Sequence, residues 1–280
     1  MPELPEVETL KRELSRVLVG KKIKNFSAEK FALDLVGKKI ESVERRAKIL
    51  ILELSTSQKL EAKSYLLVHL KMTGQLIYLP ASGTKAKPVM GGHPEDPTKY
   101  TRAVFQFTDT SQLLFNDLRK FGWLKLVSSS EAATILDRHG VEPLSRAFTL
   151  DKFKEILARY PKRKIKQLLL DQTLIAGLGN IYVDEACFGA YILPTRLVGS
   201  LNEQEVADLH QAIIAVLKLS ISKKGTSARN YRRSTGEKGG MVALLNVYGR
   251  AKLPCKRCAG TIAKIKLNGR GTHFCNSCQK

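Results

Sequence analysis

Two pairs of cysteines near the end of the chain constrain the fold more than any other feature of the sequence. Cys255 and Cys258 form the motif CKRC, and Cys275 and Cys278 form CNSC after sixteen intervening residues. Two CxxC pairs at this separation predict a tetrahedral zinc site with four thiolate ligands. Because sulfur fills all four positions, no open position remains for a reactive water, and the predicted Zn²⁺ is structural.

The alternative is a pair of disulfides, which requires an oxidising compartment. The chain begins with acidic residues, whereas a signal peptide needs basic residues followed by an apolar core. No apolar run approaches the ~20 residues of a membrane helix. We therefore expect a soluble protein of the cytoplasm that has no membrane partner and binds one structural zinc ion.

Between the two cysteine pairs lies the basic stretch IAKIKLNGRGTHF, which predicts a hairpin carrying Lys264, Lys266 and Arg270. The whole chain has 47 basic and 26 acidic residues, a net charge of +21. Such an excess attracts polyanions, and nucleic acid is the most common one. The alternative is that solvated lysines only keep the protein soluble. The basic hairpin on a zinc site favours DNA.

The order of the remaining elements predicts an α+β protein with several domains. Residues 2–18 have the apolar spacing of a helix, with Pro5 and three glutamates in its first turns. Seven strand-like runs separated by polar turns then predict an antiparallel β-sandwich, over residues 40–46, 48–54, 65–72, 74–79, 103–109, 111–117 and 123–127. Residues 81–99 are expected to form a long loop.

From about residue 129 the spacing becomes helical, and we expect helices over residues 130–140, 150–160, 162–172, 180–192 and 202–224. Residues 225–240 have no apolar period and many Gly, Ser and Arg residues, which is typical of a mobile loop. Cys187, within a predicted helix, is interpreted as an ordinary buried thiol.

The turn AGLGN, between two of these helices, has the features of a phosphate-binding turn. Its glycines allow positive φ, and Asn180 stands where a helix begins with exposed amides. A simple packing turn is the alternative. The nearby basic run PKRKIK, which contains Arg163 and Lys166, favours phosphate binding.

Two further turns carry large apolar side chains next to basic ones. Met72 lies in HLKMTGQ, and Arg119 and Phe121 lie in DLRKFGW. A core methionine and a buried phenylalanine are the simplest interpretation. Apolar wedges with an arginine between them are also what proteins insert between base steps when they kink a duplex.

Seven motifs in this order closely resemble those of the bacterial formamidopyrimidine-DNA glycosylase family: MPELPEVET, RRAKILILEL, HLKMTGQL, DLRKFGW, LLLDQTLIAGLGNIYVDE, LNVYGR and the terminal cysteine pairs. The resemblance implies an N-terminal helix with a β-sandwich (1–130), a helix–two-turn–helix domain (131–224), a flexible lesion-recognition loop (225–243) and a β-hairpin zinc finger (244–280). It also implies a monomer that binds double-stranded DNA with oxidised bases or abasic sites, in the nucleoid.

The resemblance assigns the chemistry to the first residues. After removal of Met1, Pro2 would carry a secondary amine that attacks C1′ of a damaged nucleotide and forms a Schiff base. Glu3 would be the general acid, Lys48 a second acid and phosphate contact, and Arg270 the finger arginine that aids elimination. An α-amino group, with a pKa of about 7.7–8.0, is partly neutral near pH 7, so it can act as a nucleophile.

The same resemblance implies supporting and binding roles. Glu6 and Glu185 would support the active site, and Glu185 matches an acidic residue that faces the nucleophile. The implied DNA contacts are Met72, Tyr100, Arg119, Phe121, Arg163, Lys166 and Asn180. The chain has Tyr100-Thr101-Arg102 before a strand where His-x-His is common. The loop would read the flipped base, although it has Arg232 and Arg233 where acids are common, and Met241-Val242 in place of Phe-Gln.

Three other functions compete with a glycosylase/lyase for oxidised purines. An endonuclease VIII-like enzyme would prefer oxidised pyrimidines, but MPELPE and the set Met72, Arg119 and Phe121 favour purines. A non-catalytic binder of damaged DNA would be expected if Pro2 or Glu3 were lost. An unrelated zinc-finger regulator would leave the acidic N-terminus unexplained.

Overall fold

The computed structural model describes residues 1–56, 63–81, 99–228 and 230–280. These residues form two compact units, and each unit combines two stretches of chain. The first comprises Met1–Asp137 and Lys223–Gly240, and the second comprises Arg138–Ser222 and Met241–Lys280. The loop predicted over residues 81–99 lies outside the described residues, apart from its two end positions. Among the described helices, none has the length and apolar character that a membrane span needs.

The first unit begins with α1 (Leu4–Leu18), as the apolar spacing predicts. Pro5 stands in the first turn, where its missing N–H costs no hydrogen bond. The apolar stripe of the helix is fully buried against the β-sandwich and consists of Val7, Leu10, Leu14 and Leu18. The buried stripe therefore fixes the helix, and with it the first residues of the chain, on the sandwich.

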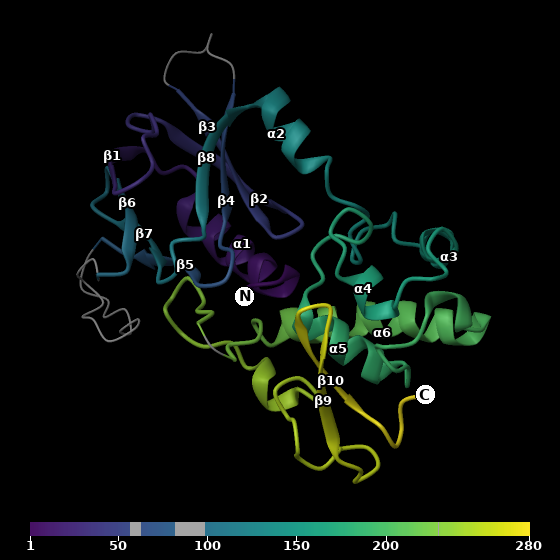
Figure 1. The fold of residues 1–280 in the computed structure, drawn as a ribbon. Coiled ribbons are helices and arrows are strands. Elements are labelled where there is room, and N and C mark those ends of the chain that lie inside the picture. Colours follow the sequence, from purple (N-terminus) through teal and green to yellow (C-terminus); the bar gives the residue numbers. More distant parts are fainter. Residues whose placement is uncertain (57–62, 82–98, 229) are drawn as a thin grey trace. The chain divides into compact units, whose positions relative to one another are not determined.

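Two four-stranded antiparallel sheets form this sandwich (Figure 1). One sheet has the order β1 (Ile23–Ala28), β6 (Thr101–Phe107), β7 (Gln112–Asp117), β5 (Gly74–Leu79). The other has the order β2 (Lys39–Arg46), β3 (Ile49–Ser55), β4 (Ser64–His69), β8 (Trp123–Ser128). The seven predicted strands are all present. The sequence did not predict β1, in which only Ile23 is buried, so the strand has too few apolar residues to show a period of two.

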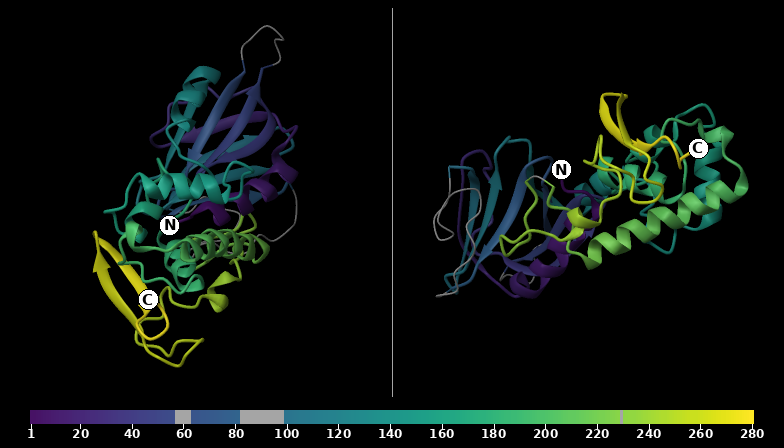
Figure 2. Two further views of the ribbon diagram at one scale, coloured as in Figure 1. Left: turned by 90° about the vertical axis from the view of Figure 1, so that its right-hand side faces the viewer. Right: turned by 90° about the horizontal axis from the view of Figure 1, so that it is seen from below.

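A short helix, α2 (Ser129–Leu136), also belongs to the first unit, because it packs against β4 and β8. The second unit contains α3 (Leu150–Ala158), α4 (Ile165–Leu169), α5 (Asn180–Gly189) and α6 (Glu203–Ser222). Two 3₁₀ turns complete it, η1 (Val198–Ser200) and η2 (Met241–Leu244). Figure 2 shows α6 as the long green helix of this unit.

The helix α5 is buried on all sides, from Ile181 to Phe188. It follows α4 after the glycine-containing turn that the sequence predicted, and α6 packs along it. Two of its buried residues, Asp184 and Glu185, are acidic. Since a buried charge without a partner is costly, this helix is expected to attract donors from other segments.

The end of the chain folds into the predicted hairpin, β9 (Ile262–Leu267) and β10 (Arg270–Cys275). Its two-residue turn is Asn268-Gly269, with positive φ at both positions, the combination that a tight hairpin turn favours. Phe188, Val247 and Ile262 form a small core with two of the cysteines. The predicted fold class is thus confirmed: a helix with a sandwich, a helical domain and a C-terminal β-hairpin module.

Candidate active site

The N-terminal end of α1 brings three predicted residues together. Pro2 is buried, and Glu3 and Glu6 are almost fully buried, at 2% and 1% exposure. The backbone N–H of Glu3 donates to Oε2 of Glu6 over 2.8 Å. Glu3 stands at the N-cap of α1, where the positive end of the helix favours a carboxylate. The local helix start therefore fixes the backbone around the predicted nucleophile.

The other oxygen of Glu6 reaches a segment more than 200 residues away in sequence. Its Oε1 accepts a hydrogen bond from the N–H of Thr226 over 2.7 Å. The Tyr231 hydroxyl donates to the Glu6 carbonyl over 3.4 Å. Burial, with the carboxylates of Glu6 and Glu13 close by, raises the pKa of Tyr231 well above its usual range, so the phenol stays protonated.

Lys48 lies in the tight turn between β2 and β3 and is 7% exposed. Ala47, the preceding residue, has a φ of 55°, which closes the turn. The Arg45 side chain bridges this turn to α1, because its Nη1 donates to the Ala47 carbonyl over 2.9 Å and its Nε to Glu8 over 3.0 Å. Burial opposes ionisation of Glu8, but hydrogen bonds from Arg12 and Arg45 hold its pKa below the usual value.

The three predicted wedge residues meet at one place. Met72 and Phe121 are both exposed, in the turns after β4 and β7. The Arg119 guanidinium lies between them: Nη1 is 3.0 Å from the Met72 sulfur, and the central carbon is 4.6 Å from the Phe121 ring centroid. Two exposed apolar side chains flanking an arginine match the arrangement that the sequence predicted, and the simple core interpretation is wrong for Met72 and Phe121.

Asp117 holds the backbone of this wedge in place, a role that the sequence did not reveal. The carboxylate is buried, and it accepts from the N–H groups of Arg119 (3.2 Å) and Gly122 (2.7 Å) and from the Thr73 hydroxyl. The Asp117 N–H donates to the Tyr100 carbonyl over 2.9 Å. Tyr100 is thereby tied to the turn that carries the wedge.

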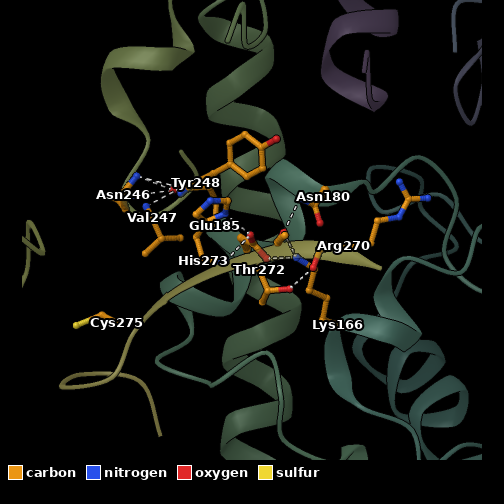
Figure 3. Close-up of polar contacts among 12 residues, drawn as sticks. Lys166, Asn180, Glu185, Asn246, Val247, Tyr248, Arg270, Thr272, His273 and Cys275 are labelled. Carbon is orange, nitrogen blue, oxygen red and sulfur yellow. Dashed lines mark hydrogen bonds and ion pairs between the residues drawn. The ribbon is translucent and has the colours of Figure 1, made fainter. Parts of the chain in front are cut away.

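In the second unit, two predicted phosphate contacts converge on one carbonyl oxygen (Figure 3). The Gly271 carbonyl, directly after Arg270 in the hairpin, accepts from Asn180 Nδ2 over 2.8 Å and from Lys166 Nζ over 3.1 Å. Lys166 is only 1% exposed, and its Nζ also lies 2.6 Å from the Asp184 carboxylate. Lys166 thus holds the hairpin from inside the unit, while Arg270 itself is exposed.

Asp184 connects this cluster to β10. Its Oδ2 accepts from the His273 N–H over 2.9 Å and lies 3.1 Å from His273 Nδ1. The side chain is fully buried, and partners on two segments, α4 and β10, satisfy its charge. A cavity of about 180 Å³ adjoins the cluster and is lined by Lys166, Gln167, Leu170, Leu267, Asn268 and Arg270.

The remaining predicted residues of this unit have clear partners. Arg163 is partly exposed, pairs with Asp171 over 3.1 Å and lies over the Tyr160 ring. The Glu185 carboxylate accepts from the N–H groups of Asn246, Val247 and Tyr248, at 2.9–3.0 Å. Burial raises the pKa of Glu185, and these amides oppose the shift. Its predicted role beside the nucleophile stays a prediction.

The four cysteines form a metal site. Their sulfur atoms all lie within 4.8 Å of one another. Cys255 and Cys258 precede β9, and Cys275 and Cys278 lie at the end of β10 and just after it. Sulfur atoms at this separation fit the tetrahedral coordination of Zn²⁺, whose Zn–S bonds are about 2.3 Å long. Of the residues that the structure describes, no other group of three or more histidines, cysteines or acids is close enough to hold a metal. The residues present thus fit one structural zinc ion, as predicted.

Comparison with known proteins explains this combination of elements. Three family models match the chain: the formamidopyrimidine-DNA glycosylase N-terminal domain over residues 1–124, its helix–two-turn–helix domain over 139–231, and the zinc finger that it shares with isoleucyl-tRNA synthetases over 252–280. Together these matches cover most of the chain. The chain belongs to the formamidopyrimidine-DNA glycosylase family.

Curated members of the formamidopyrimidine-DNA glycosylase family align along the full length. The chain is 41% identical to the Streptococcus mutans protein and 40% identical to that of Herpetosiphon aurantiacus, with 100% of each chain covered. Among solved structures, a Lactococcus lactis mutant bound to Fapy-dG-containing DNA has a TM-score of 0.85 at 36% identity, with 100% of both chains covered. The L. lactis protein with abasic-site DNA has the same TM-score and identity, with 99% of each chain covered.

Several residues with buried or charge-assisted contacts near the predicted site residues could not be identified from the sequence. They are Glu13, Arg45, Asp117, Asp184 and Arg257. The Arg257 guanidinium stacks on the Phe188 and Tyr191 rings, at 3.9 and 3.6 Å from their centroids, and lies 4.0 Å from the Cys278 sulfur. Its position inside the CKRC motif was the only available signal. Each of the five has at least one partner far away in sequence, which no local pattern identifies.

Proposed function

We propose that the protein is a bifunctional DNA glycosylase and abasic-site lyase that removes oxidised purines, such as 8-oxoguanine and formamidopyrimidines, from double-stranded DNA. The observation that carries this proposal is the arrangement at the start of the family's N-terminal domain. Pro2 is buried directly beside the buried acid Glu3, and the Glu3 backbone is held by Glu6. The net charge of +21 suits a DNA substrate.

The chemistry follows from an N-terminal secondary amine. Once Met1 is removed, the neutral Pro2 nitrogen attacks C1′ of the damaged nucleotide, and the bond to the base breaks. Glu3 protonates the sugar ring oxygen as the ring opens, which leaves an iminium between Pro2 and C1′. The iminium acidifies the C2′ protons. Loss of one of them expels the 3′ phosphate by β-elimination, and δ-elimination then expels the 5′ phosphate.

Residues of the second unit hold the phosphates in this proposal. Arg270 is exposed at the hairpin tip, next to the cavity described above, and contributes a guanidinium for a phosphate. Asn180, at the start of α5, and the partly exposed Arg163 add polar contacts. Lys166 is buried against Asp184, so it acts by holding Gly271 and thereby Arg270. Lys48 contributes a further cation from the β2–β3 turn.

Once the damaged nucleotide has left the stack, the duplex is stabilised by the wedge. Met72 and Phe121 fill the gap, and Arg119 between them faces the unpaired base of the other strand. Tyr100, tied to the same turn through Asp117, contacts the neighbouring backbone. We call the segment 223–240 of the first unit, which contains most of the loop predicted over residues 225–243, the recognition loop, and we propose that it reads the flipped base.

A second candidate substrate class, oxidised pyrimidines, has one observation in its favour. The wild-type L. lactis protein, 36% identical to this chain, has been crystallised with DNA that contains an oxidised pyrimidine. The departures at Arg232 and Arg233 lie in the recognition loop, where lesion range is decided.

Borohydride trapping tests the enzyme and its lesion class together. The protein is incubated with duplexes containing 8-oxoguanine opposite cytosine, dihydrouracil, or an abasic site, and covalent adducts are resolved by electrophoresis. We expect adducts with 8-oxoguanine and abasic DNA. A protein that retains Met1 should form none, and Pro2→Gly should form far fewer. Pro5→Ala, which leaves the amine intact, is the matched control.

Each trapping result has a distinct meaning. No adduct on any duplex, with DNA binding intact, would identify a non-catalytic binder and overturn the proposal. Adducts on dihydrouracil and abasic DNA alone would establish the pyrimidine class. We further propose that the protein acts as a monomer in the cytoplasm, on nucleoid DNA; size-exclusion chromatography with light scattering tests the monomer, since a dimer would elute at twice 31.2 kDa.

A further inference from the structure

The recognition loop leaves α6 and returns close to its own starting point. The N–H of Gly240 donates to the Lys223 carbonyl over 2.7 Å, and the N–H of Gly239 donates to the Ser227 hydroxyl over 2.8 Å. A compact loop whose ends meet in this way is stabilised mainly by its own side chains and by what they contact. Because its sequence is rich in Gly and Ser, the loop needs such contacts to hold one conformation.

The beginning of the loop is held by the first turn of α1. Thr226 donates its N–H to Glu6, as described above. Gly225 has a φ of +84°, and a Cβ there would lie 2.9 Å from the Tyr231 ring and 3.0 Å from Glu6 Oε1. The chain can therefore approach Glu6 this closely only with glycine at this position.

The middle of the loop is held by the sandwich. The Tyr231 ring is 4% exposed and belongs to the same core as the apolar stripe of α1. Gln75 on β5 is also buried, and its Nε2 donates to the Asn230 carbonyl over 2.5 Å. These contacts fix Tyr231 and the backbone directly before it.

The return half of the loop is held by one carboxylate in the middle of α1 and by one backbone hydrogen bond from β5, in which the Tyr78 N–H donates to the Ser234 carbonyl over 2.9 Å. Glu13 Oε1 accepts from Arg233 Nε over 2.7 Å, and Oε2 accepts from the Ser234 N–H over 3.1 Å and its hydroxyl over 2.8 Å. Arg233 also pairs with Glu237 within the loop, over 2.7 Å. The Glu13 side chain is only 14% exposed, so water screens this contact little.

The contact with Glu13 explains why the loop has an arginine at position 233, since an acidic residue there would repel the Glu13 carboxylate. Three donors on two consecutive loop residues converge on one carboxylate, and they come from backbone, hydroxyl and guanidinium. Charge-assisted hydrogen bonds of this kind are stronger than neutral ones and fix orientation. Of the contacts that hold the loop, this one is also the farthest along α1 from the reacting residues.

We propose that Glu13 is a specificity-determining residue: by holding Arg233 and Ser234, it sets the conformation in which the recognition loop reads the damaged base. The inference rests on the proposed function. Because Glu13 acts through Arg233 and Ser234, it is a positioning residue. The helix that carries Pro2 and Glu3 at its start thus also positions the segment that selects the base.

This role separates two reactions of the same enzyme. Excision of 8-oxoguanine requires the base to be read, whereas an abasic site offers no base to the loop. Disturbing Glu13 should therefore slow excision and leave abasic-strand cleavage and trapping unchanged. A residue that only stabilised α1 would affect both reactions alike, since Pro2 and Glu3 serve both.

The test compares full-length Glu13→Gln with wild type in single-turnover assays on 8-oxoguanine, dihydrouracil and abasic duplexes. We expect excision of 8-oxoguanine to fall about tenfold, the factor that corresponds to ~1.4 kcal/mol, and abasic cleavage to stay within about twofold. The ratio of 8-oxoguanine to dihydrouracil excision should also change. Limited trypsin digestion without DNA should cut the variant faster within residues 223–240.

Two further variants sharpen the test. Lys11 lies on α1, like Glu13, and forms an ion pair with Glu44 on β2. Glu44→Gln breaks this pair and is the matched control that should leave every reaction unchanged. The exchange Glu13→Arg with Arg233→Glu restores an ion pair of the opposite sense and should recover part of the excision rate. Arg233→Glu alone should be as slow as Glu13→Gln or slower.

Normal excision and normal tryptic resistance in Glu13→Gln would overturn the inference. So would an equal loss of excision and abasic cleavage, which would make Glu13 a merely structural residue of α1. These results differ from failure of the proposed function, in which the wild-type protein itself would cleave no abasic DNA and trap none.

Discussion

Glu6 and Glu185 hold chain segments in the two units in different ways. Both are almost fully buried, and both accept backbone N–H groups from distant parts of the sequence. Glu185 takes three consecutive amides, Asn246 to Tyr248, just before the zinc module. Glu6 takes one amide from its own helix, at Glu3, and one from the recognition loop, at Thr226.

The two glutamates lie in regions that are held by different kinds of contact. Around Glu185, the amide cluster fixes the segment just before the zinc module, and the Lys166–Asp184–His273 contacts and the zinc site fix the hairpin within that module. Among its described residues, the recognition loop has no metal-binding cluster and is held by hydrogen bonds from side chains, one buried ring and backbone hydrogen bonds at Ser234 and at its two ends. In the proposed function, the second unit is the fixed phosphate holder and the loop on α1 is the adjustable reader.

Removing the metal should have the largest effect, and only in the second unit. Cys275→Ser leaves three thiolates, and structural zinc contributes an apparent ~10–16 kcal/mol to the folding of such modules. We expect loss of zinc, an unfolded hairpin and loss of DNA affinity. Zinc content by a chromogenic chelator and DNA anisotropy measure this.

Two readouts check that the effect stays in the second unit. Fluorescence of Trp123, which lies on β8 of the sandwich, should keep its wild-type emission. Cys187→Ala, at a buried thiol away from the zinc site, should keep its zinc and is the control. Loss of the Trp123 signal in Cys275→Ser would contradict the separation of the two regions.

Breaking the buried ion pair should have the next largest effect. Asp184→Asn leaves the Lys166 ammonium buried without its anion, at a cost of about 3–5 kcal/mol. Urea unfolding followed by circular dichroism measures it. Asp171→Asn, which removes the partly exposed partner of Arg163, should cost no more than about 1 kcal/mol. Equal losses in the two variants would mean that the Asp184 cluster does not fix the hairpin.

The smallest effect is a pH dependence. Burial raises the pKa of Glu185 above its ordinary value of 4.5 in the folded protein. The folded state then binds the proton more tightly than the unfolded state. This difference in proton binding stabilises the folded protein below pH 4.5, and the stabilisation is lost as the pH rises through the folded-state pKa. The stability of wild type relative to Glu185→Gln should therefore fall with rising pH, by at most about 1.4 kcal/mol per pH unit.

Asp109 on the sandwich supplies the opposite sign as a control. A hydrogen bond from Lys21 lowers the pKa of Asp109 to about 2, so its contribution is present above pH 3.8 and is lost as the pH falls towards 2. The stability of wild type relative to Asp109→Asn should thus increase as the pH rises from 2 to 4. Thermal unfolding of the three proteins across pH 2–8 measures both slopes. If relative stability changed with pH in the same direction for Glu185→Gln and Asp109→Asn, the predicted opposite effects of the buried and the surface carboxylate would be wrong.

Much of the fold could be predicted because its signals are local. The spacing of Cys255, Cys258, Cys275 and Cys278 defines a zinc site, since two adjacent knuckles need only short-range geometry. Period-two runs predicted seven strands, and the exposed Met72 and Phe121 could be predicted from the turns that carry them. The strand β1 was not predicted, because it buries a single residue and therefore shows no period-two pattern.

The sequence by itself therefore determined the elements, the metal ligands, the acidic start of the chain and the family to which these motifs belong. Only the tertiary structure decided which partner each acidic side chain meets: Arg233 for Glu13, Lys166 for Asp184, and the Thr226 N–H for Glu6. Spacing encodes contacts within one helix or strand. Contacts between residues up to 225 positions apart depend on the folding of the whole unit, which desolvates both partners and aligns them.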